Sequence, residues 1–293
     1  MNPAPALKKS TPVNSHLPAK RTYRRRTVSS SKASSPINRR NGDGSNIATQ
    51  DAIIQLPIKS NVPLGWILSS ATQILVDHLL FSRGLIPLSV AQLKDEKQEE
   101  VLKSRSQRRK VTQCRSRLES WRLDWSQIDI RILENCLCIV ISLGPSFLRS
   151  KELYVLNVAE ARNSSEHPTS KLPPVHALAR RLLPRVLESD TKLPRRSAPS
   201  FQLSVSLCVE ALALEVALND ESNEMSNLFI RRPGYKLPTE KTKQPSQRVT
   251  YINILNADSS NEAAVKTTET VRVADVAHWV SLRSSIKGFR LSG

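Results

Sequence analysis

The sequence predicts an α+β domain with helices first, followed by a mostly antiparallel β-sheet with one crossing helix. Apolar residues recur every three or four positions over 64–78 and again over 111–132, which is typical of helices that bury one face. The continuous apolar run 136–143 ends at a Gly-Pro pair and indicates a central strand buried on both faces. Residues 201–209 alternate between apolar and polar side chains, which predicts a half-buried strand.

The other elements follow from the same patterns. We expect the folded region to begin near Ile53 and the first helix to end with a C-terminal cap at Gly84. A strand over 153–158 should lie beside the central one, followed by a third helix over 175–188. Loops are expected over 219–227 and 239–247, and strands over 249–255 and 270–276. One alternative stays open, because 205–218 could also form a helix.

Apolar side chains continue almost to the C-terminus, where chain ends usually fray. The residues concerned are Trp279, Val280, Leu282, Ile286 and Phe289. Leaving such side chains in water costs about 1.5–3 kcal/mol each. We therefore expect this terminal ribbon to be docked, either on its own domain or on a partner.

The N-terminal region has a different composition. Residues 1–52 are rich in Ser, Pro, Asn, Lys and Arg, so we expect a disordered basic tail, with the folded domain over 53–293. The chain has a net charge of +18; residues 1–60 contain 11 Lys and Arg against 2 acidic residues, which accounts for 9 of these charges. Such a tail suggests an acidic partner, a nucleic acid or an import receptor. Residues 20–26 could be a nuclear localisation signal, and residues 24–29 could be a phosphorylation site for a basic-directed kinase. The alternative is that both segments are solvated charged residues without such a role.

Motifs for catalysis are missing from this sequence. It contains neither a phosphate-binding glycine loop nor a nucleophile elbow. The Cys136 and Cys138 pair lacks zinc spacing, so both are expected to be reduced core residues, and His78 is expected at the core or its boundary. We expect no enzyme activity, no cofactor, no metal site and no membrane-spanning helix.

Five segments match one known family in order and rough spacing. They are 74–94, 138–154, 178–183, 232–238 and 279–290, and the most specific motif is the closing Lys-Gly-Phe-Arg that follows Trp279. Together they resemble the comet family of Mad-two-binding proteins, which silence the spindle assembly checkpoint. The likeness covers roughly residues 60–290 and leaves out the basic tail.

This resemblance implies a HORMA-like domain, with three helices packed on a β-sheet and a C-terminal "safety belt" anchored here by Trp279 and Phe289. It implies two partners. The first is the closed form of the Mad-two checkpoint protein, itself a HORMA domain, and the second is the pachytene-checkpoint AAA+ ATPase that remodels it. The implied role is a non-enzymatic adaptor in the nucleus and cytoplasm, with a kinetochore or spindle location in mitosis.

The third helix is the expected contact with Mad-two. At about 100° per residue, Leu178, Leu182 and Val186 form a core stripe, with Leu183 and Leu187 on its shoulder and Arg180 on another face. By resemblance, Arg180, Leu183 and Leu187 would bind the partner, although the shoulder could instead be a broader core face. Pro184 predicts a kink or a late helix start.

Two further sites follow from the resemblance. Ser82 stands where the family has an interface Gln. Arg231, Arg232, Pro233 and Lys236 resemble the Arg-Pro-Lys segment that contacts the ATPase, with the family's Lys falling at Gly234, or at Arg232 if the register slips by one. A solvated hairpin loop is the alternative interpretation of this segment.

A second class of function remains open on the residues alone. The chain could be a basic nuclear protein that binds nucleic acid through residues 1–60. Only one aromatic residue, Tyr23, interrupts this tail, which makes a poor platform for stacking bases.

Overall fold

The computed structural model describes residues 51–59, 62–86, 88–94, 105–158, 172–191, 201–211, 213–215, 225–239, 242–244, 247–257 and 277–288. These residues form a mixed α+β fold around an eight-stranded sheet, which confirms the predicted α+β class. Three expectations lie outside the described residues: the tail over 1–50, the strand over 270–276 and the anchor Phe289.

The described elements alternate along the chain. The helices are α1 (Leu64–Ser82), α2 (Val90–Lys94), α4 (Arg105–Ser126), α5 (Ile130–Glu134), the 3₁₀ turn η1 (Phe147–Arg149), α6 (Val175–Thr191) and α8 (Met225–Leu228). The strands are β1 (Ala52–Ile58), β2 (Cys136–Gly144), β3 (Glu152–Asn157), β4 (Gln202–Glu210), β5 (Phe229–Arg231), β6 (Arg248–Asn256), β7 (Ala277–Leu282) and β8 (Ile286–Lys287).

The strands pair in the order β1-β6-β3-β2-β4-β7-β5, and β8 pairs with β4 off this path. The pairs β1–β6 and β3–β6 are parallel and the others are antiparallel, so the expected mostly antiparallel sheet is confirmed. Strand β1 was not predicted, and Pro57 within it fits its place at the edge, where a missing N–H costs little.

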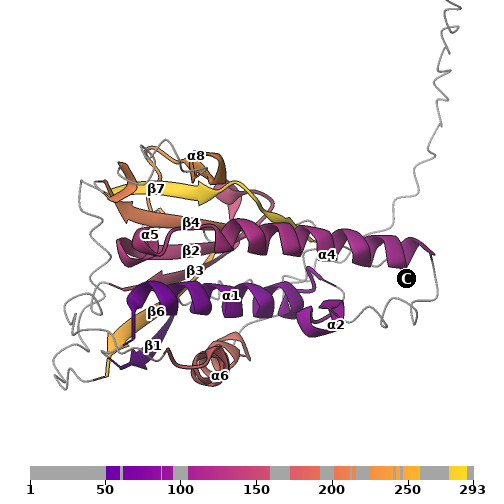
Figure 1. Ribbon diagram of the computed structural model, residues 1–293, viewed down its shortest axis with the longest axis horizontal. Helices are drawn as coiled ribbons and strands as arrows, with labels where there is room; N and C mark the ends of the chain where they lie inside the picture. The colour runs from indigo at the N-terminus through magenta and orange to yellow at the C-terminus, as the bar shows by residue number, and fades with distance from the viewer. Residues whose placement is uncertain are drawn as a thin grey trace, which may run out of the picture. The chain divides into compact units, whose positions relative to one another are not determined.

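The long helices lie over one face of the sheet (Figure 1). Helices α1 and α4 are tied by an ion pair between Arg122 and Asp77, 2.7 Å apart, and by a hydrogen bond of 3.2 Å that Trp125 Nε1 donates to Ser69 Oγ. Helix α1 is long and apolar enough to cross a membrane by length and composition alone, but ten of its residues are buried within this fold. Its apolar character is therefore accounted for by the core.

The expected second helix over 111–132 is in fact two helices. Helix α4 ends at Ser126, and α5 begins after Asp129, whose carboxylate accepts a hydrogen bond of 2.9 Å from the backbone N–H of Arg131. An aspartate in this position is a strong N-cap, and it starts a new helix inside a periodic apolar run. Ile128 and Ile132 are buried as expected, but Ile128 lies in the connection between the two helices and Ile132 in α5.

Strand β4 is buried on both faces, so the prediction of a half-buried strand was wrong. Its second face belongs to a smaller apolar cluster with members on five strands and in the segment that follows β5. That cluster contains Cys138, Val140, Leu153, Val155, Cys208, Val249 and Trp279, with Tyr235 and Leu237 packed against it. The helical alternative for 205–218 fails as well, because the chain is a strand up to Glu210.

Other predictions are confirmed or corrected locally. Strands β2, β3 and β6 and helix α6 lie where the patterns placed them. The four residues of α8 are helical, whereas the loop prediction extended to residue 227. Gly84 has a φ of 62° after the end of α1, as a C-terminal cap requires. Cys136 and Cys138 are buried free thiols in the core, as expected.

The terminal ribbon is docked on its own domain as far as residue 288. Strand β7 inserts between β4 and β5, and β8 pairs with the start of β4. Val280, Leu282 and Ile286 are buried in the main core, while Trp279 is 6% exposed on the second face.

Replacing Trp279 by alanine should lower the free energy of unfolding by about 3–5 kcal/mol, because it would leave a cavity under Tyr235. Urea titration followed by circular dichroism measures the change. His278→Ala, on the same strand but exposed, is the control and should change stability by less than about 0.5 kcal/mol. Equal stabilities for the two variants would contradict a docked ribbon.

Candidate functional site

Helix α6 presents an apolar shoulder to solvent. Leu178, Leu182 and Val186 are buried, as the helical spacing predicted. Leu183 is half-buried and Leu187 is 47% exposed, with Arg180 exposed near them. Arginine is enriched at protein-binding surfaces, and here Arg180 lies beside exposed apolar area on an ordered helix.

Pro184 neither starts nor ends this helix. Helix α6 runs from Val175 to Thr191 with Pro184 inside it, and the side chain of Pro184 is exposed. The absence of a backbone N–H at this position removes one hydrogen bond from the helix. Tertiary contacts must therefore contribute to holding α6 in place.

A buried ionic network supplies such contacts at the C-terminal end of α6. Asp190 Oδ1 accepts hydrogen bonds of 2.9 Å from Arg83, at the end of α1, and 2.8 Å from Arg248, on β6. Arg83 also donates to Glu152 Oε2 at 2.8 Å and to the hydroxyl of Tyr154 at 2.6 Å, both on β3. Two carboxylates and two guanidinium groups thus join three elements of the fold to α6.

The network shifts the pKa of its members. Burial alone would raise the pKa of Asp190, but nearby His78 and the charges and hydrogen bonds of Arg83 and Arg248 outweigh it and hold this pKa well below its usual value. His78 Nε2 lies 3.9 Å from Asp190 Oδ2. Burial, followed by the charge of Glu152, raises the pKa of the Tyr154 hydroxyl. Asp190 is therefore ionised at neutral pH and pairs with permanent cations.

A second contact fixes α6 beside the edge of the sheet. Arg185 donates a hydrogen bond to the backbone carbonyl of Gln55, on edge strand β1. This side chain therefore covers part of the exposed edge. Its neighbours Leu183 and Leu187 remain at least partly accessible to solvent.

Ser82 lies at the end of α1 that faces the C-terminal end of α6, but its hydroxyl oxygen is buried and makes no hydrogen bond to any described residue, so this hydroxyl does not face solvent. Ser82 precedes Arg83, which bonds Asp190, and Leu187 is three residues before Asp190. Beside Ser82 lies Phe81, which is 52% exposed and which the sequence analysis did not single out. Exposed aromatic side chains are frequent anchors of interfaces. Its position near Arg83 and Asp190 depends on a contact across 107 residues, so helical periodicity alone could not have found it.

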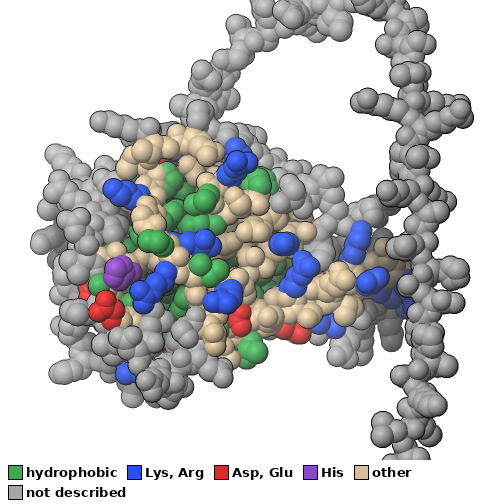
Figure 2. Space-filling model, turned by 90° about the horizontal axis from the view of Figure 1, so that it is seen from above, with side chains coloured by type: hydrophobic (Ala, Val, Ile, Leu, Met, Phe, Trp, Pro, Cys, Tyr) green, Lys and Arg blue, Asp and Glu red, His purple; other side chains and the backbone are tan. Residues whose placement is uncertain are grey.

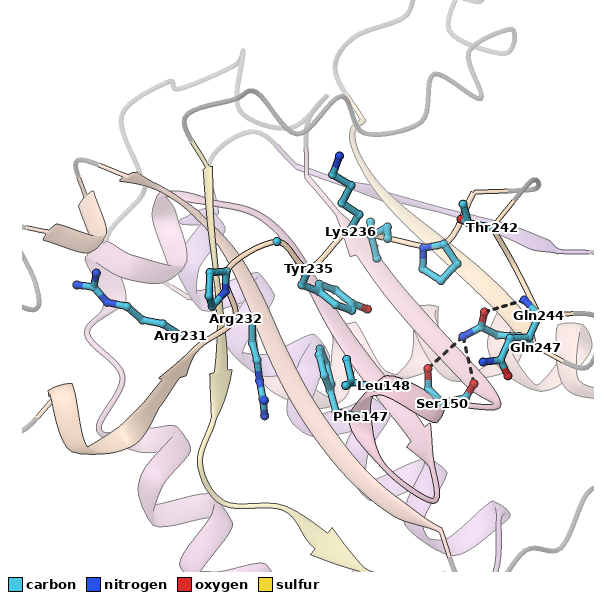
Figure 3. A pocket seen from close by; sticks show the side chains of 14 residues that line it. Phe147, Leu148, Ser150, Arg231, Arg232, Tyr235, Lys236, Thr242, Gln244 and Gln247 are labelled. Atoms are coloured by element: carbon cyan, nitrogen blue, oxygen red, sulfur yellow. Dashed lines mark hydrogen bonds between the residues drawn. The ribbon is translucent and has the colours of Figure 1, made fainter.

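The predicted basic segment surrounds an open pocket of about 560 Å³ on the other face of the sheet (Figure 3). Phe147 and Tyr235 form its apolar wall with ring centroids 4.7 Å apart, and Tyr235 packs edge-on against Trp279 at 4.9 Å. Gln247 Nε2 donates to both the carbonyl and the hydroxyl oxygen of Ser150, each at 3.1 Å. Burial, with a smaller contribution from Cys138, raises the pKa of Tyr235 to about 12.

The four residues predicted in this segment have different environments. Arg232 is half-buried: its guanidinium lies 5.0 Å from the ring centroid of Phe147, and its Nε donates to Ser281 Oγ at 3.1 Å. Arg231, Pro233 and Lys236 are exposed, and Figure 3 shows Arg231 and Lys236 pointing away from the aromatic wall. Arg232 therefore supports the loop, while Arg231 and Lys236 present positive charge to solvent.

The backbone conformation at position 234 favours glycine. Its φ is 74°, a left-handed conformation that side chains other than glycine rarely adopt. A lysine at this position would be strained. The nearest exposed cations of the segment are Arg231 and Lys236.

The two surfaces are separate, because the basic segment starts at Arg231 and runs over the second face of the sheet, where Tyr235 packs. Helix α6 lies beside edge strand β1, whereas Arg231 is on β5, the strand at the other end of the order. Within the described ranges, no group of three His, Cys, Asp or Glu residues is placed to hold a metal ion. The arrangement suits two separate protein contacts on one rigid scaffold.

A scan against protein-family models finds no family that matches this chain, and a search of curated proteins finds no sequence match. The functional argument therefore depends on the residues and their geometry.

Asp190→Asn should lower the free energy of unfolding at pH 7 by about 3 kcal/mol, because it removes the carboxylate that pairs with Arg248 and leaves Arg83 paired only with Glu152 among the described carboxylates. The folded-state pKa of Asp190 lies below its unfolded value of about 3.9, so its contribution is present at neutral pH and is lost as the pH falls towards the folded-state pKa. The variant should therefore lose less stability than the wild type between about pH 5 and pH 2. Urea titrations across this range measure both effects.

The matched control is Glu119→Gln, which removes an exposed carboxylate from α4. It should follow the wild-type pH profile. If Asp190→Asn also followed that profile, the assignment of Asp190 as the ion that holds α6 would be wrong.

Proposed function

We propose that this protein is a non-enzymatic adaptor with a HORMA-like domain. It binds the closed form of the Mad-two checkpoint protein and presents it to the pachytene-checkpoint AAA+ ATPase, which promotes disassembly of the mitotic checkpoint complex. The observation that carries the proposal is the pair of separate exposed surfaces, the α6 shoulder beside β1 and the basic segment on the second face of the sheet, because an adaptor must hold two proteins at once.

The architecture supports a HORMA-like assignment. Helices α1 and α4 lie over one face of a mostly antiparallel sheet, α6 lies beside edge strand β1, and the C-terminal ribbon forms β7 and β8 within that sheet. Trp279, the anchor that the resemblance implies, is buried in the cluster on the second face.

The surface assigned to Mad-two consists of Phe81, Ser82, Arg180, Leu183 and Leu187. Partner binding would bury Phe81 and Leu187, whose exposure in the free domain is otherwise unfavourable. The helix that carries the leucines is already fixed by Asp190 and Arg185, so binding would cost little ordering entropy.

Leu187→Glu should weaken binding of purified closed Mad-two protein by at least about thirtyfold, or 2 kcal/mol, because it places a charge in the centre of the contact. Isothermal titration calorimetry measures the affinity. Leu123→Glu, at a similarly exposed leucine on α4, is the matched control and should bind normally. Equal affinities for the two variants would reject α6 as the binding surface.

The surface assigned to the ATPase consists of Arg231, Pro233 and Lys236, held in place by Arg232. Its exposed cations fit an acidic partner surface, and charges of this kind mainly raise association rates. The loop has a firm base, because the backbone N–H of Arg232 donates to the carbonyl of Trp279 at 2.8 Å.

The double substitution Arg231→Glu/Lys236→Glu should abolish most of the adaptor-dependent conversion of closed Mad-two by the ATPase while leaving Mad-two affinity unchanged. The measurement is a conversion assay with the three purified proteins, together with calorimetry for Mad-two. Lys59→Glu/Arg283→Glu changes the charge equally at other exposed positions and should retain conversion. Loss of conversion in both variants would show a general charge effect and contradict the assignment of this loop.

A further inference from the structure

The N-terminal half of α4 is the most basic surface among the described residues that the proposed adaptor role does not use. Residues 105–117 contain six Lys or Arg and no Asp or Glu; the six are Arg105, Arg108, Arg109, Lys110, Arg115 and Arg117. Figure 1 shows this end of α4 extending beyond the sheet, and Figure 2 shows Lys and Arg side chains near it.

The helix separates buried apolar residues from exposed polar ones. Val111, Cys114 and Leu118 are buried and define the inner side. At about 100° per residue, Arg105, Arg109, Thr112 and Ser116 lie within about 55° of the opposite direction. All four are exposed, as are Arg108 and Gln113. The outer side is thus a polar strip with Arg105 and Arg109 at its start, and the exposed Arg108 lies on its flank, about 90° from the outer direction.

Two other cations of α4 have structural roles. Arg115 donates to the backbone carbonyl of Leu93 at 2.6 Å, and Arg122 pairs with Asp77. These contacts attach the helix to α2 and α1. They hold the polar strip rigidly, and the exposed arginines lie beyond them towards the N-terminal end.

We propose that this strip, defined by Arg105, Arg108, Arg109, Thr112 and Ser116, binds the phosphate backbone of a nucleic acid. Arginine forks match phosphate oxygens, and Ser hydroxyls are frequent further donors to phosphate. The Thr112 hydroxyl donates to the backbone carbonyl of Arg108 at 3.0 Å and would have to turn to reach a phosphate. With a rise of about 1.5 Å per residue, the strip is about 16 Å long, which is enough to follow several phosphates spaced by about 3.4 Å along one strand of a duplex.

Other partners fit this surface less well. The apolar residues of 105–117, Val111 and Cys114, are both buried, so this half of the helix has no apolar side to insert into a membrane. A protein partner usually needs an exposed aromatic or aliphatic anchor, and the strip has none. Contacts to phosphates do not read the edges of the bases, so we expect the binding affinity to depend little on the nucleotide sequence. The proposal does not depend on the adaptor role.

The test measures binding of the full-length chain to fluorescein-labelled 20-base-pair duplexes of DNA and of RNA by fluorescence anisotropy between 50 and 200 mM NaCl. The variant is Arg105→Glu/Arg108→Glu/Arg109→Glu. The control is Lys59→Glu/Arg149→Glu/Arg283→Glu, which changes net charge equally at exposed positions outside α4. Both variants keep the basic N-terminal tail.

Each lost phosphate contact should reduce the slope of log K against log salt by about 1. For at least one duplex, we expect the magnitude of this slope to fall by about 2 to 3 in the α4 variant and by less than about 1 in the control variant. The two duplexes separate DNA from RNA. Equal slopes for the two variants would overturn the proposal and leave the tail as the binding region. Binding to phosphatidylserine vesicles without binding to either duplex would also overturn it.

Discussion

The position of α6 depends on one buried carboxylate, that of Asp190. It receives hydrogen bonds from Arg83 at the end of α1 and from Arg248 on β6, and Arg83 extends the network to β3. Burying such charges is costly unless each is paired, so the network favours a single arrangement of these elements. That arrangement brings the C-terminal end of α1 close to the C-terminal end of α6, which carries the exposed Leu187. The surface assigned to Mad-two is therefore a consequence of the ionic network.

The C-terminal ribbon and the basic loop are similarly coupled. The sheet needs cover on both faces, since β2 and β4 are apolar on each side. Trp279 and Tyr235 supply part of that cover, and their edge-on packing fixes the loop to β7. Arg232 adds a backbone hydrogen bond to Trp279 and a side-chain bond to Ser281. The ribbon thus does more than close the sheet, because it also sets the base from which Arg231 and Lys236 extend.

Local pattern was sufficient for most elements of this fold. The apolar spacing of α1 and the continuous apolar run of β2 reflect burial that is visible along the chain. The ionic network could not be predicted in this way, because Arg83 and Asp190 are 107 residues apart. Strand β1 was missed because its partner β6 is about 200 residues away, and the buried second face of β4 was missed because its cover comes from Tyr235 and Trp279. Of the candidate site, the exposed face of α6 was predictable, whereas Phe81 beside Ser82 and the supporting role of Arg232 required the fold.

The most direct test of the adaptor account is amide hydrogen exchange, measured by mass spectrometry on the chain alone and with purified closed Mad-two protein. The account predicts slower exchange in peptides that cover residues 172–191 and the last turn of α1, with peptides from β5 to residue 238 unchanged. Protection confined to other peptides, or no protection at saturating Mad-two, would contradict it.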